Sequence, residues 1–195
     1  MSELFKNHFL QLHLLTSYPP ANLNRDDLGR PKTAFMGGSL RLRVSSQSLK
    51  RAWRTSEVFE SALSGNLGVR TKENGIEIYN NLKEKGVSEK DAKTWAKSIA
   101  GVFGKPKKAD TNYPLRELEV EQLVHIGPEE KQEIDRLVST ISDRGSGPEE
   151  EELNLLRNYT GAADIALFGR MLADATMFNA EAAAQVAHAL AVHRC

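Results

Sequence analysis

The sequence predicts an α+β fold in which a small β-sheet is interrupted by a large helical insertion. Three observations support this. Apolar runs near both ends have the length of buried strands, the middle shows helical periodicity, and the elements follow the order strand, strand–helix, helices, strand, helix. This order is typical of a split βαβ arrangement. A chain of 195 residues suits one ordinary domain or a domain with a large insertion.

An apolar run close to the start of the chain predicts the first strand. Within residues 7–17, the sequence FLQLHLL is dense and is followed by turn residues, which favours a buried strand over a helix. Gln11 and His13 interrupt the run and no basic leader precedes it, so it lacks the pattern of a signal peptide or a membrane span. Residues 17–38 are rich in Pro, Asn, Asp and Gly and predict a long loop.

A strand that leads into a helix is the clearest local pattern. Aliphatic residues alternate with Arg41 and Arg43, which predicts a strand with a buried aliphatic face and both arginines on the opposite face. Two arginines on an exposed face repel each other unless an anion lies over them. Ser45 and Ser46 favour a helix N-terminus, and the apolar spacing over 47–63 predicts the helix.

The middle of the chain, from 65 to 157, predicts an insertion made of polar helices. We expect helices at 76–85, 89–103 and 129–141, because apolar residues recur there at helical spacing. A short strand is expected at 118–126.

The end of the chain returns to compact patterning after an acidic connector. Residues 145–152 predict that connector, which we expect to be flexible. The run ADIALF at 163–168 predicts a buried strand. The alanine-rich stretch 180–192 predicts a helix whose small side chains allow close packing on a sheet.

A net charge of zero hides an uneven distribution of charge. The 26 Lys and Arg balance the 26 Asp and Glu over the whole chain. Residues 20–56, however, hold eight cations against two acids, and residues 128–152 hold nine acids against three cations. Such asymmetry indicates a surface for a polyanion on one part of the molecule. Two solvated faces that happen to differ are the alternative.

The segment RLRVSSQSLKRAWR, residues 41–54, carries five cations with no acid between them. A phosphate chain would find backbone N–H groups at a helix start, hydroxyls and cations close together there. The candidate phosphate-binding residues are Arg41, Arg43, Ser46, Gln47, Lys50, Arg51 and Arg54. The alternative is an amphipathic strand–helix pair with a solvated basic face, and the sequence alone leaves both open.

Three further places carry candidate functional residues. Lys32, in the long loop, could reach a phosphate. Met171 could place an apolar wedge beside nucleobases with Arg170 on the backbone, although a Met after a strand is more often core. Asp26 and Asp27 could hold Mg²⁺ in a nuclease, although such a cluster more often forms Asx turns.

No other motif indicates catalysis or a cofactor. The sequence contains no GxGxxG, Walker A, HExxH or GxSxG pattern, so we expect no enzyme activity, no cofactor and no metal site. His188 and His193 lack the spacing of a helical metal pair. Cys195 is the single cysteine and cannot form an internal disulfide, which fits a reducing compartment.

Three blocks of the sequence closely resemble the CasC family. They are LNRDDLGRPKTAFMGGSLRLRVSSQSLKRAWR at 23–54, ADIALFGRM at 163–171 and AAAQVAHALAVH at 182–193. They occur in the family's order and at about its spacing, whereas residues 65–157 are similar only in character. This family provides the repeated backbone subunit of the type I-E CRISPR Cascade surveillance complex, an antiviral defence system.

The resemblance implies a hand-shaped subunit with a palm, fingers and a thumb. The palm would be a modified RRM-like (ferredoxin-like) sheet formed by residues 1–64 and 158–195, and the helical fingers would be residues 65–157. The family continues beyond a position like His193, whereas this chain stops at Cys195. The resemblance therefore implies that the thumb and the C-terminal part of the sheet are absent, which leaves a sheet edge exposed.

The resemblance also implies RNA binding without chemistry. Copies would polymerise along the guide RNA (crRNA) in the cytoplasm, together with other Cascade subunits and away from membranes, and the guide would pair with target DNA. The residues that match family positions in or beside the RNA-backbone groove are Arg25, Ser45, Gln47, Lys50, Arg51 and Arg54. Met171 matches a residue that props bases near a kink in the RNA.

Two alternative functions remain open from the sequence. One is a metal-dependent endoribonuclease of the wider RAMP superfamily, in which Asp26 or Asp27 would take part in cutting RNA. The other is a purely structural scaffold with no affinity for RNA.

Overall fold

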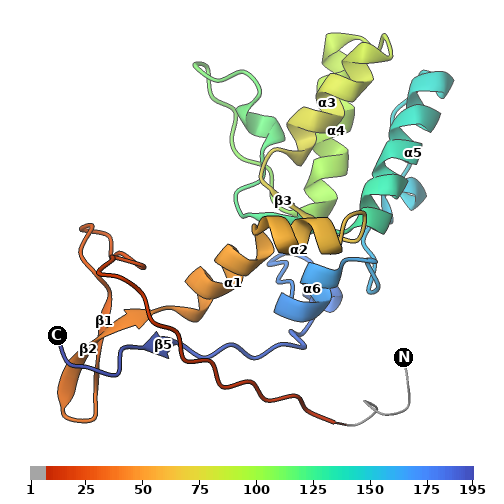
Figure 1. Cartoon of the computed structure of the whole chain (residues 1–195). Helices are drawn as coiled ribbons and strands as arrows, with labels where there is room; N and C mark the ends of the chain where they lie inside the picture. Colours follow the sequence, from red (N-terminus) through yellow and green to blue (C-terminus); the bar gives the residue numbers. More distant parts are fainter. Residues whose placement is uncertain (1–7) are drawn as a thin grey trace. The chain divides into compact units, whose positions relative to one another are not determined.

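The computed structural model describes residues 8–195, which form two compact units (Figure 1). The first unit comprises the described residues up to Ser48 together with His188–Cys195, and the second comprises Leu49–Ala187. Small antiparallel sheets and several helices make a mixed fold of α-helices and β-strands, which agrees with the predicted class. Helix α1 (Ser46–Arg54) begins in the first unit and continues in the second.

The first unit contains a three-stranded antiparallel sheet. The hairpin of β1 (Thr33–Met36) and β2 (Ser39–Val44) places β2 in the centre, and β5 (Ala189–Leu190) pairs with the end of β2. The predicted strand at 40–44 is therefore confirmed, whereas β1 falls within the stretch that we expected to be loop.

A two-residue turn closes the hairpin between β1 and β2. Gly37 and Gly38 have φ values of 61° and 72°. Positive φ at both turn residues gives the backbone twist that matches a hairpin, and glycine adopts it without a steric penalty. The Gly-Gly dipeptide was thus the sequence signal for β1.

The aliphatic face of β2 is not buried as the alternation predicted. Leu40 is 46% exposed, and Leu42 and Val44 are half-buried. Among the described residues of the first unit, no hydrophobic side chain belongs to the buried core. A short sheet excludes water only where another layer packs on it, and alternation in the sequence cannot supply that layer.

The strand predicted over 7–17 is wrong for the residues that the structure describes, and Asn7 lies outside them. Residues 8–17 form neither strand nor helix, and all of them are exposed (Figure 1). A dense apolar run favours burial, but a strand also requires a neighbour for its backbone hydrogen bonds.

The helix predicted over 47–63 is divided into α1 and α2 (Glu57–Ala62). Ser56 lies at the break, where its hydroxyl donates to the Trp53 carbonyl oxygen at 2.7 Å and accepts from the Phe59 N–H at 3.3 Å. The hydroxyl therefore caps α2 and competes with a continuous helix.

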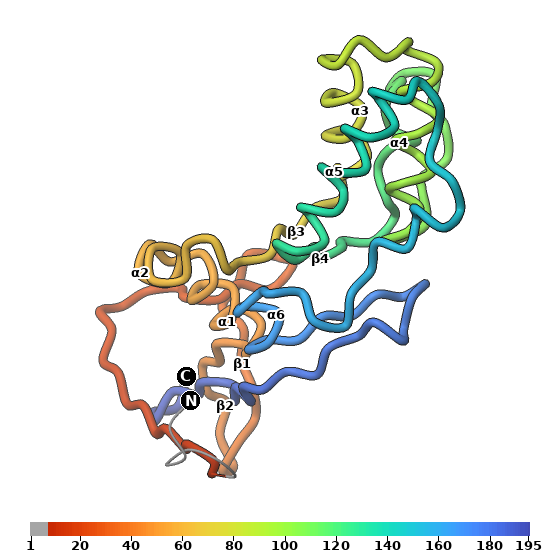
Figure 2. The backbone as a smooth tube through the Cα atoms, turned by 90° about the vertical axis from the view of Figure 1, so that its right-hand side faces the viewer, coloured from red at the N-terminus to blue at the C-terminus, as the bar shows by residue number. Residues whose placement is uncertain are grey.

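Three longer helices form the second unit's main body. α3 (Asn74–Glu84), α4 (Glu89–Phe103) and α5 (Pro128–Arg144) lie side by side and confirm the three helices that the periodicity predicted (Figures 1 and 2). Their apolar faces supply most of the buried core. Its fully buried members include Ile78, Leu82, Ala92, Ala96, Ile99, Ile134 and Ile141.

A two-stranded antiparallel sheet lies at one end of this body. β3 (Val69–Thr71) pairs with β4 (Val124–Ile126), with Arg70 opposite His125. The strand predicted at 118–126 is therefore shorter than expected, because Leu118 ends the helical turn η2 (Arg116–Leu118) and residues 119–123 form bends and an isolated bridge.

The segment predicted as a flexible connector is bonded to α5. Arg144 donates to the Gly147 carbonyl oxygen at 2.9 Å and pairs with Glu152 at 2.8 Å. This segment runs into the helical turn η3 (Glu151–Leu153). The hydrogen bond from Arg144 lowers the pKa of Glu152 to about 2.

The strand predicted at 163–168 is wrong, because these residues form helix α6 (Ala163–Phe168). The Ala166 N–H donates to the Ala162 carbonyl oxygen at 3.0 Å, and the Gly169 N–H donates to Ile165 at 2.8 Å. A short apolar run has no periodicity that separates a strand from a buried helix.

The helix predicted at 180–192 is also wrong. The Ala183 N–H donates to Ala166 at 2.9 Å and the Ala184 N–H donates to Leu167 at 2.9 Å, so these donors are committed to α6. Beyond them the only regular element is β5, and the turn η4 (Thr176–Phe178) precedes the segment. The helical propensity of alanine is weak enough for tertiary contacts to override it.

No helix within residues 8–195 combines the length and the apolar character that crossing a bilayer requires.

Two glycines inside helices provide a matched test of packing in the second unit. A Cβ at Gly75 in α3 would lie 2.2 Å from the Leu118 carbonyl oxygen, whereas a Cβ at Gly101 in α4 would approach nothing closer than Pro106 Cγ at 3.8 Å. We expect Gly75→Ala to lower the free energy of unfolding by about 1–3 kcal/mol through overpacking. Gly101→Ala should raise it by up to about 1 kcal/mol through helix propensity. Chemical denaturation followed by circular dichroism measures both, and equal effects of the two substitutions would contradict the packing described.

Candidate nucleic-acid interface

The two arginines of β2 have different environments in the first unit. Arg41 donates from Nε to the Met36 carbonyl oxygen at 3.1 Å and from Nη1 to the carbonyl oxygens of Ala191, at 3.2 Å, and Val192. Its guanidinium therefore links the hairpin to the C-terminal segment. Arg43 is half-buried, and its Nε has no hydrogen-bond partner among the described residues. Carbonyl oxygens do not neutralise a guanidinium, so both arginines keep their positive charge.

Side chains of the first unit occupy part of the start of α1. Ser45 is buried, and its hydroxyl accepts from the Ser48 N–H at 3.3 Å, as an N-cap does. The Ser46 N–H donates to His188 Nδ1 at 2.9 Å. The expectation of free N–H groups is therefore wrong for Ser46 and Ser48, while the side chain of Gln47 is exposed.

The long loop folds back along β2 in the first unit. The Lys32 carbonyl oxygen accepts from the Arg43 N–H at 2.9 Å, and Asn24 Oδ1 accepts from the Ser45 N–H at 2.9 Å. Arg25 is exposed and Lys32 half-buried, and neither side chain has a hydrogen bond or ion pair with residues 8–195. The loop therefore brings two cations without counterions to the strand that carries Arg43.

Asp26 organises this loop. Its Oδ1 accepts from the N–H groups of Leu28, at 2.9 Å, and Arg30, at 2.8 Å, and its Oδ2 accepts from Arg30 Nε at 3.2 Å. The N–H of Arg30 is the main cause that lowers the pKa of Asp26. These contacts are those of an Asx turn and give the nuclease alternative no support from Asp26.

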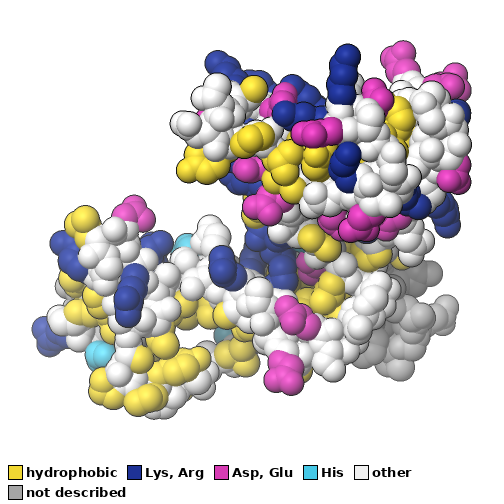
Figure 3. Space-filling model, turned by 90° about the horizontal axis from the view of Figure 1, so that it is seen from above, with side chains coloured by type: hydrophobic (Ala, Val, Ile, Leu, Met, Phe, Trp, Pro, Cys, Tyr) yellow, Lys and Arg dark blue, Asp and Glu magenta, His cyan; other side chains and the backbone are white. Residues whose placement is uncertain are grey.

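The part of α1 that belongs to the second unit carries two cations without counterions. Arg51 is exposed and Lys50 half-buried, and within residues 8–195 no carboxylate lies within ion-pair distance of either. Several other cations of this unit are paired; Lys131 lies 2.7 Å from Glu77, and Lys97 lies 2.7 Å from Glu117. Figure 3 shows charges of both signs mixed over the helices on the visible face.

Arg54, one turn further along α1, is held differently. Its Nε is buried and lies 3.4 Å from the Asp164 carboxylate, and its guanidinium carbon lies 5.0 Å from the centre of the Phe168 ring. The ring and the carboxylate fix the side chain, which remains 16% exposed. Arg54 is thus both a structural residue and a cation that reaches the surface.

Asp164 is the buried carboxylate at the centre of this arrangement. His125 Nε2 lies 2.8 Å from its Oδ2, and the Gly68 N–H donates to its Oδ1 at 2.9 Å. Burial raises the pKa of Asp164, but contacts with His125 and Gly68 and the charge of Arg54 lower it by more. Its carboxylate is therefore ionised and available to hold Arg54.

Arg170 is buried and neutralised in the second unit. Its Nη1 lies 2.7 Å from Glu130 Oε2, with side-chain exposures of 1% and 0%. It also donates to the carbonyl oxygens of Arg157, at 2.8 Å, and Phe178, at 3.0 Å. These contacts commit the guanidinium to the protein interior, so the expectation that it contacts an RNA backbone is corrected.

Met171 has the exposure that the sequence interpretation requires. Met171 is 76% exposed, directly after the buried Arg170, and lies beside a hollow of 320 Å³. That hollow is lined by Phe168, Gly169, Arg170, Met171, Ala180 and Ala182. The role of Met171 beside nucleobases stays a prediction.

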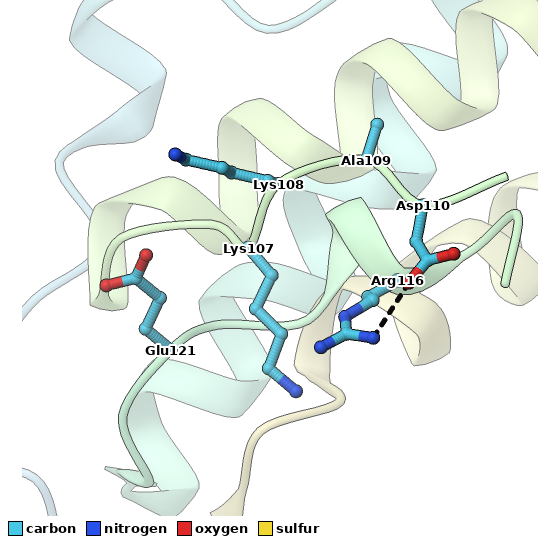
Figure 4. A pocket seen from close by; sticks show the side chains of 6 residues that line it. All are labelled: Lys107, Lys108, Ala109, Asp110, Arg116 and Glu121. Carbon is cyan, nitrogen blue, oxygen red and sulfur yellow. Dashed lines mark hydrogen bonds and ion pairs between the residues drawn. The ribbon is translucent and has the colours of Figure 1, made fainter.

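A larger pocket of 410 Å³ lies on the loop between α4 and η2 (Figure 4). Its basic side chains are largely committed to acids: Arg116 lies 2.9 Å from Asp110, and Lys107 pairs with Glu119. The pocket is therefore a weaker anion site than its lysines suggest. Among the described residues, no three His, Cys, Asp or Glu side chains gather closely enough to hold a metal ion.

The sequence interpretation missed the residues that position the cations. His188 and Asn24 contact the start of α1 and the end of β2, and Asp164 and His125 hold Arg54. No spacing rule connects such residues, because the partners lie as many as 142 positions apart in the sequence. The only sequence signal for these partners was the excess of cations in α1, because such cations attract carboxylates from elsewhere in the chain.

Comparisons with known proteins agree with the resemblance drawn from the sequence. The model of the family described as CT1975-like protein matches residues 10–195. A chain of a solved CRISPR RNA-guided surveillance complex is 31% identical with a TM-score of 0.73, and 91% of this chain and 56% of that chain are covered. A chain of a CRISPR RNA-guided surveillance complex, pre-nicking, is 33% identical with a TM-score of 0.68. The match covers 89% of this chain and 49% of that chain. The chain thus spans about half the length of these solved chains. No curated protein matches it.

The buried position of Arg170 predicts a large effect on stability. Arg170→Gln leaves the Glu130 carboxylate buried without its partner, and we expect it to lower the free energy of unfolding by about 3–5 kcal/mol. Arg136→Gln removes an arginine whose ion pair with Glu133 is exposed, and should cost no more than about 1 kcal/mol. Thermal and chemical unfolding of the two variants give the comparison. Similar losses would show that the Arg170 pair is not buried in solution.

Proposed function

Because the chain belongs to the family of CT1975-like proteins, we propose that it is a non-catalytic RNA-binding backbone subunit of a CRISPR surveillance complex. It binds the sugar–phosphate backbone of the guide RNA and assembles along it with further copies of itself and with other subunits, in the cytoplasm. The guide then pairs with target DNA. The similarity to chains of two CRISPR RNA-guided surveillance complexes supports this assignment.

The observation that carries the proposal is a set of cations without counterions. Among the candidate residues with no hydrogen bond or ion pair from the side chain within residues 8–195, Arg25 and Lys32 lie in the first unit, and Lys50 and Arg51 lie in the second. On the long helices of the second unit, by contrast, Lys97 pairs with Glu117 and Lys131 pairs with Glu77. Cations left unpaired favour a polyanion, because its binding releases counterions.

The remaining candidate residues contribute to the proposed RNA binding in different ways. Arg43 and Gln47 keep open donors, and Arg41 and Ser46 contribute charge and a hydroxyl beside them. Ser45 acts by capping α1 rather than by direct contact. Arg54 contributes a guanidinium that Asp164 fixes, and Met171 contributes an exposed apolar side chain that props a base. Arg170 is not included.

The same proposal assigns the parts of the chain to a palm and to helical fingers. Residues 1–64 and 158–195 form a palm derived from an RRM-like sheet, and residues 65–157 form helical fingers. The three-stranded sheet of the first unit and the helices α3, α4 and α5 of the second support these assignments.

Backbone binding predicts a loss of affinity that does not depend on RNA sequence. Lys50→Glu replaces a cation by an anion at the proposed interface, and we expect the dissociation constant for several unrelated single-stranded RNAs to rise about tenfold or more, by similar factors for each. Lys90→Glu makes the same charge change on α4, outside the interface, and should leave affinity within about twofold. Fluorescence anisotropy at two salt concentrations measures both variants.

The outcome distinguishes backbone binding from the alternatives. No measurable affinity of the unaltered chain for any RNA would leave only the purely structural scaffold. A strong preference for one RNA sequence, or equal effects of Lys50→Glu and Lys90→Glu, would contradict backbone recognition at α1.

The absence of catalysis is part of the proposal and has its own test. We expect labelled RNA and its complementary strand to remain intact after incubation with the chain and Mg²⁺, because the carboxylate of Asp26 is committed to its loop. Gel electrophoresis detects cleavage. Regularly spaced cuts that Asp27→Ala or Asp26→Ala abolishes would establish the nuclease instead.

A further inference from the structure

Arg70 is a cation of the second unit to which the sequence drew no attention. It lies in β3, its side chain is exposed, and it has no ion pair or hydrogen bond with any residue in the described range 8–195. Its partner across the antiparallel sheet is His125. Side chains that lie directly opposite each other point to the same face of a sheet, so Arg70 and His125 share a face.

A chain of contacts leads from that face to Arg54. His125 Nε2 lies 2.8 Å from Asp164, and Asp164 lies 3.4 Å from Arg54 Nε. Gly68 directly precedes β3, and a Cβ at this position would come within 2.6 Å of His125 Nε2. The missing side chain at Gly68 therefore leaves room for the imidazole to reach Asp164.

The charges around Asp164 do not balance. One buried carboxylate faces the guanidinium of Arg54, while the guanidinium of Arg70 has no carboxylate of its own. Burial is the main cause that lowers the pKa of Arg54, the positive charge of Arg70 lowers it further, and Asp164 opposes both. The His125–Asp164 pair thus links the strand position of Arg70 to Arg54, and an anion bound by both arginines would offset their like charges.

The guanidinium of Arg54 has N–H groups that can donate hydrogen bonds to such an anion. Within the described part of the chain its guanidinium makes no hydrogen bond, and its ion pair with Asp164 is made at Nε, 3.4 Å from the carboxylate. The terminal nitrogens of a guanidinium fixed in this way remain for a second partner. The contact with the Phe168 ring holds the plane of the group, which reduces the entropy lost when an anion binds.

We propose that Arg70 and Arg54 together bind one phosphate group of a single-stranded RNA backbone, with Asp164 and His125 as positioning residues for Arg54. This inference rests on the proposed function, whose RNA-binding residues did not include Arg70. The ligand chemistry is a phosphodiester, which two guanidiniums bind through charge-assisted hydrogen bonds. Arg70 contributes both charge and geometry, so lysine replaces it only in part.

The experiment measures the affinity of the full chain for a fluorescein-labelled uridine 20-mer by fluorescence anisotropy over a range of salt. We expect Arg70→Gln to raise the dissociation constant about fivefold or more and to reduce the slope of log affinity against log salt by about 0.7, the loss of one phosphate contact. Arg70→Lys should keep the slope and lose part of the affinity. Arg136→Gln, which removes an exposed arginine from α5, is the matched control and should change neither quantity.

A double-mutant cycle tests whether both arginines hold the same phosphate. Arg54→Lys keeps a positive charge beside Asp164 and loses the fork of the guanidinium. Combined with Arg70→Gln, it should weaken binding by less than the product of the two single effects, because one shared contact cannot be lost twice. Thermal unfolding of each variant confirms that the fold is retained, and additive effects would overturn the shared phosphate.

The failure of this inference differs from the failure of the proposed function. If the unaltered chain binds the RNA and Lys50→Glu weakens binding, but Arg70→Gln behaves like Arg136→Gln, then Arg70 has no role and the proposed function stands. If the unaltered chain does not bind RNA, both fail together.

Discussion

The buried ion pair between Arg170 and Glu130 is the interaction on which the second unit depends most. Arg170 follows α6 and Glu130 lies in the first turn of α5, so the pair joins two segments that are 40 positions apart. Glu130 also accepts from the Gly127 and Arg157 N–H groups, each at 2.9 Å. A charge pair that is fully removed from water is tolerated only when hydrogen bonds satisfy its remaining atoms, and these contacts do so. The position of Met171, the next residue, follows from that constraint.

Carboxylates decide which of the chain's cations are structural and which face outwards. Arg170 meets a buried carboxylate and becomes part of the interior. Arg54 lies with its Nε 3.4 Å from the Asp164 carboxylate and stays partly exposed, while Lys50 and Arg51 on the same helix have no ion pair within residues 8–195. Residues of similar chemistry therefore have three different roles. The distinction matters for nucleic-acid binding, because only cations without an internal counterion contribute their full charge to a polyanion.

The sequence patterns located correctly those elements that are long enough for the apolar pattern to repeat several times. α3, α4 and α5 each present several turns of one apolar stripe, and the alternation around Arg41 identified β2. Short apolar runs gave no such period, which explains why the helix α6 was mistaken for a strand. The same holds for the candidate interface. The clustering of cations in α1 could be seen in the sequence, whereas the burial of Arg170 against Glu130 could not.

By itself the sequence determined the family, the three long helices, the strand that leads into α1 and the concentration of positive charge on that helix. These are local properties, set by periodicity, capping residues and the order of charges along the chain. Only the tertiary structure decided that residues 180–187 are not helical, that Asp164 holds Arg54, and that Arg70 shares a sheet face with His125. Each of these depends on partners distant in sequence, and burial and hydrogen bonding to such partners outweigh the small energies of local propensity.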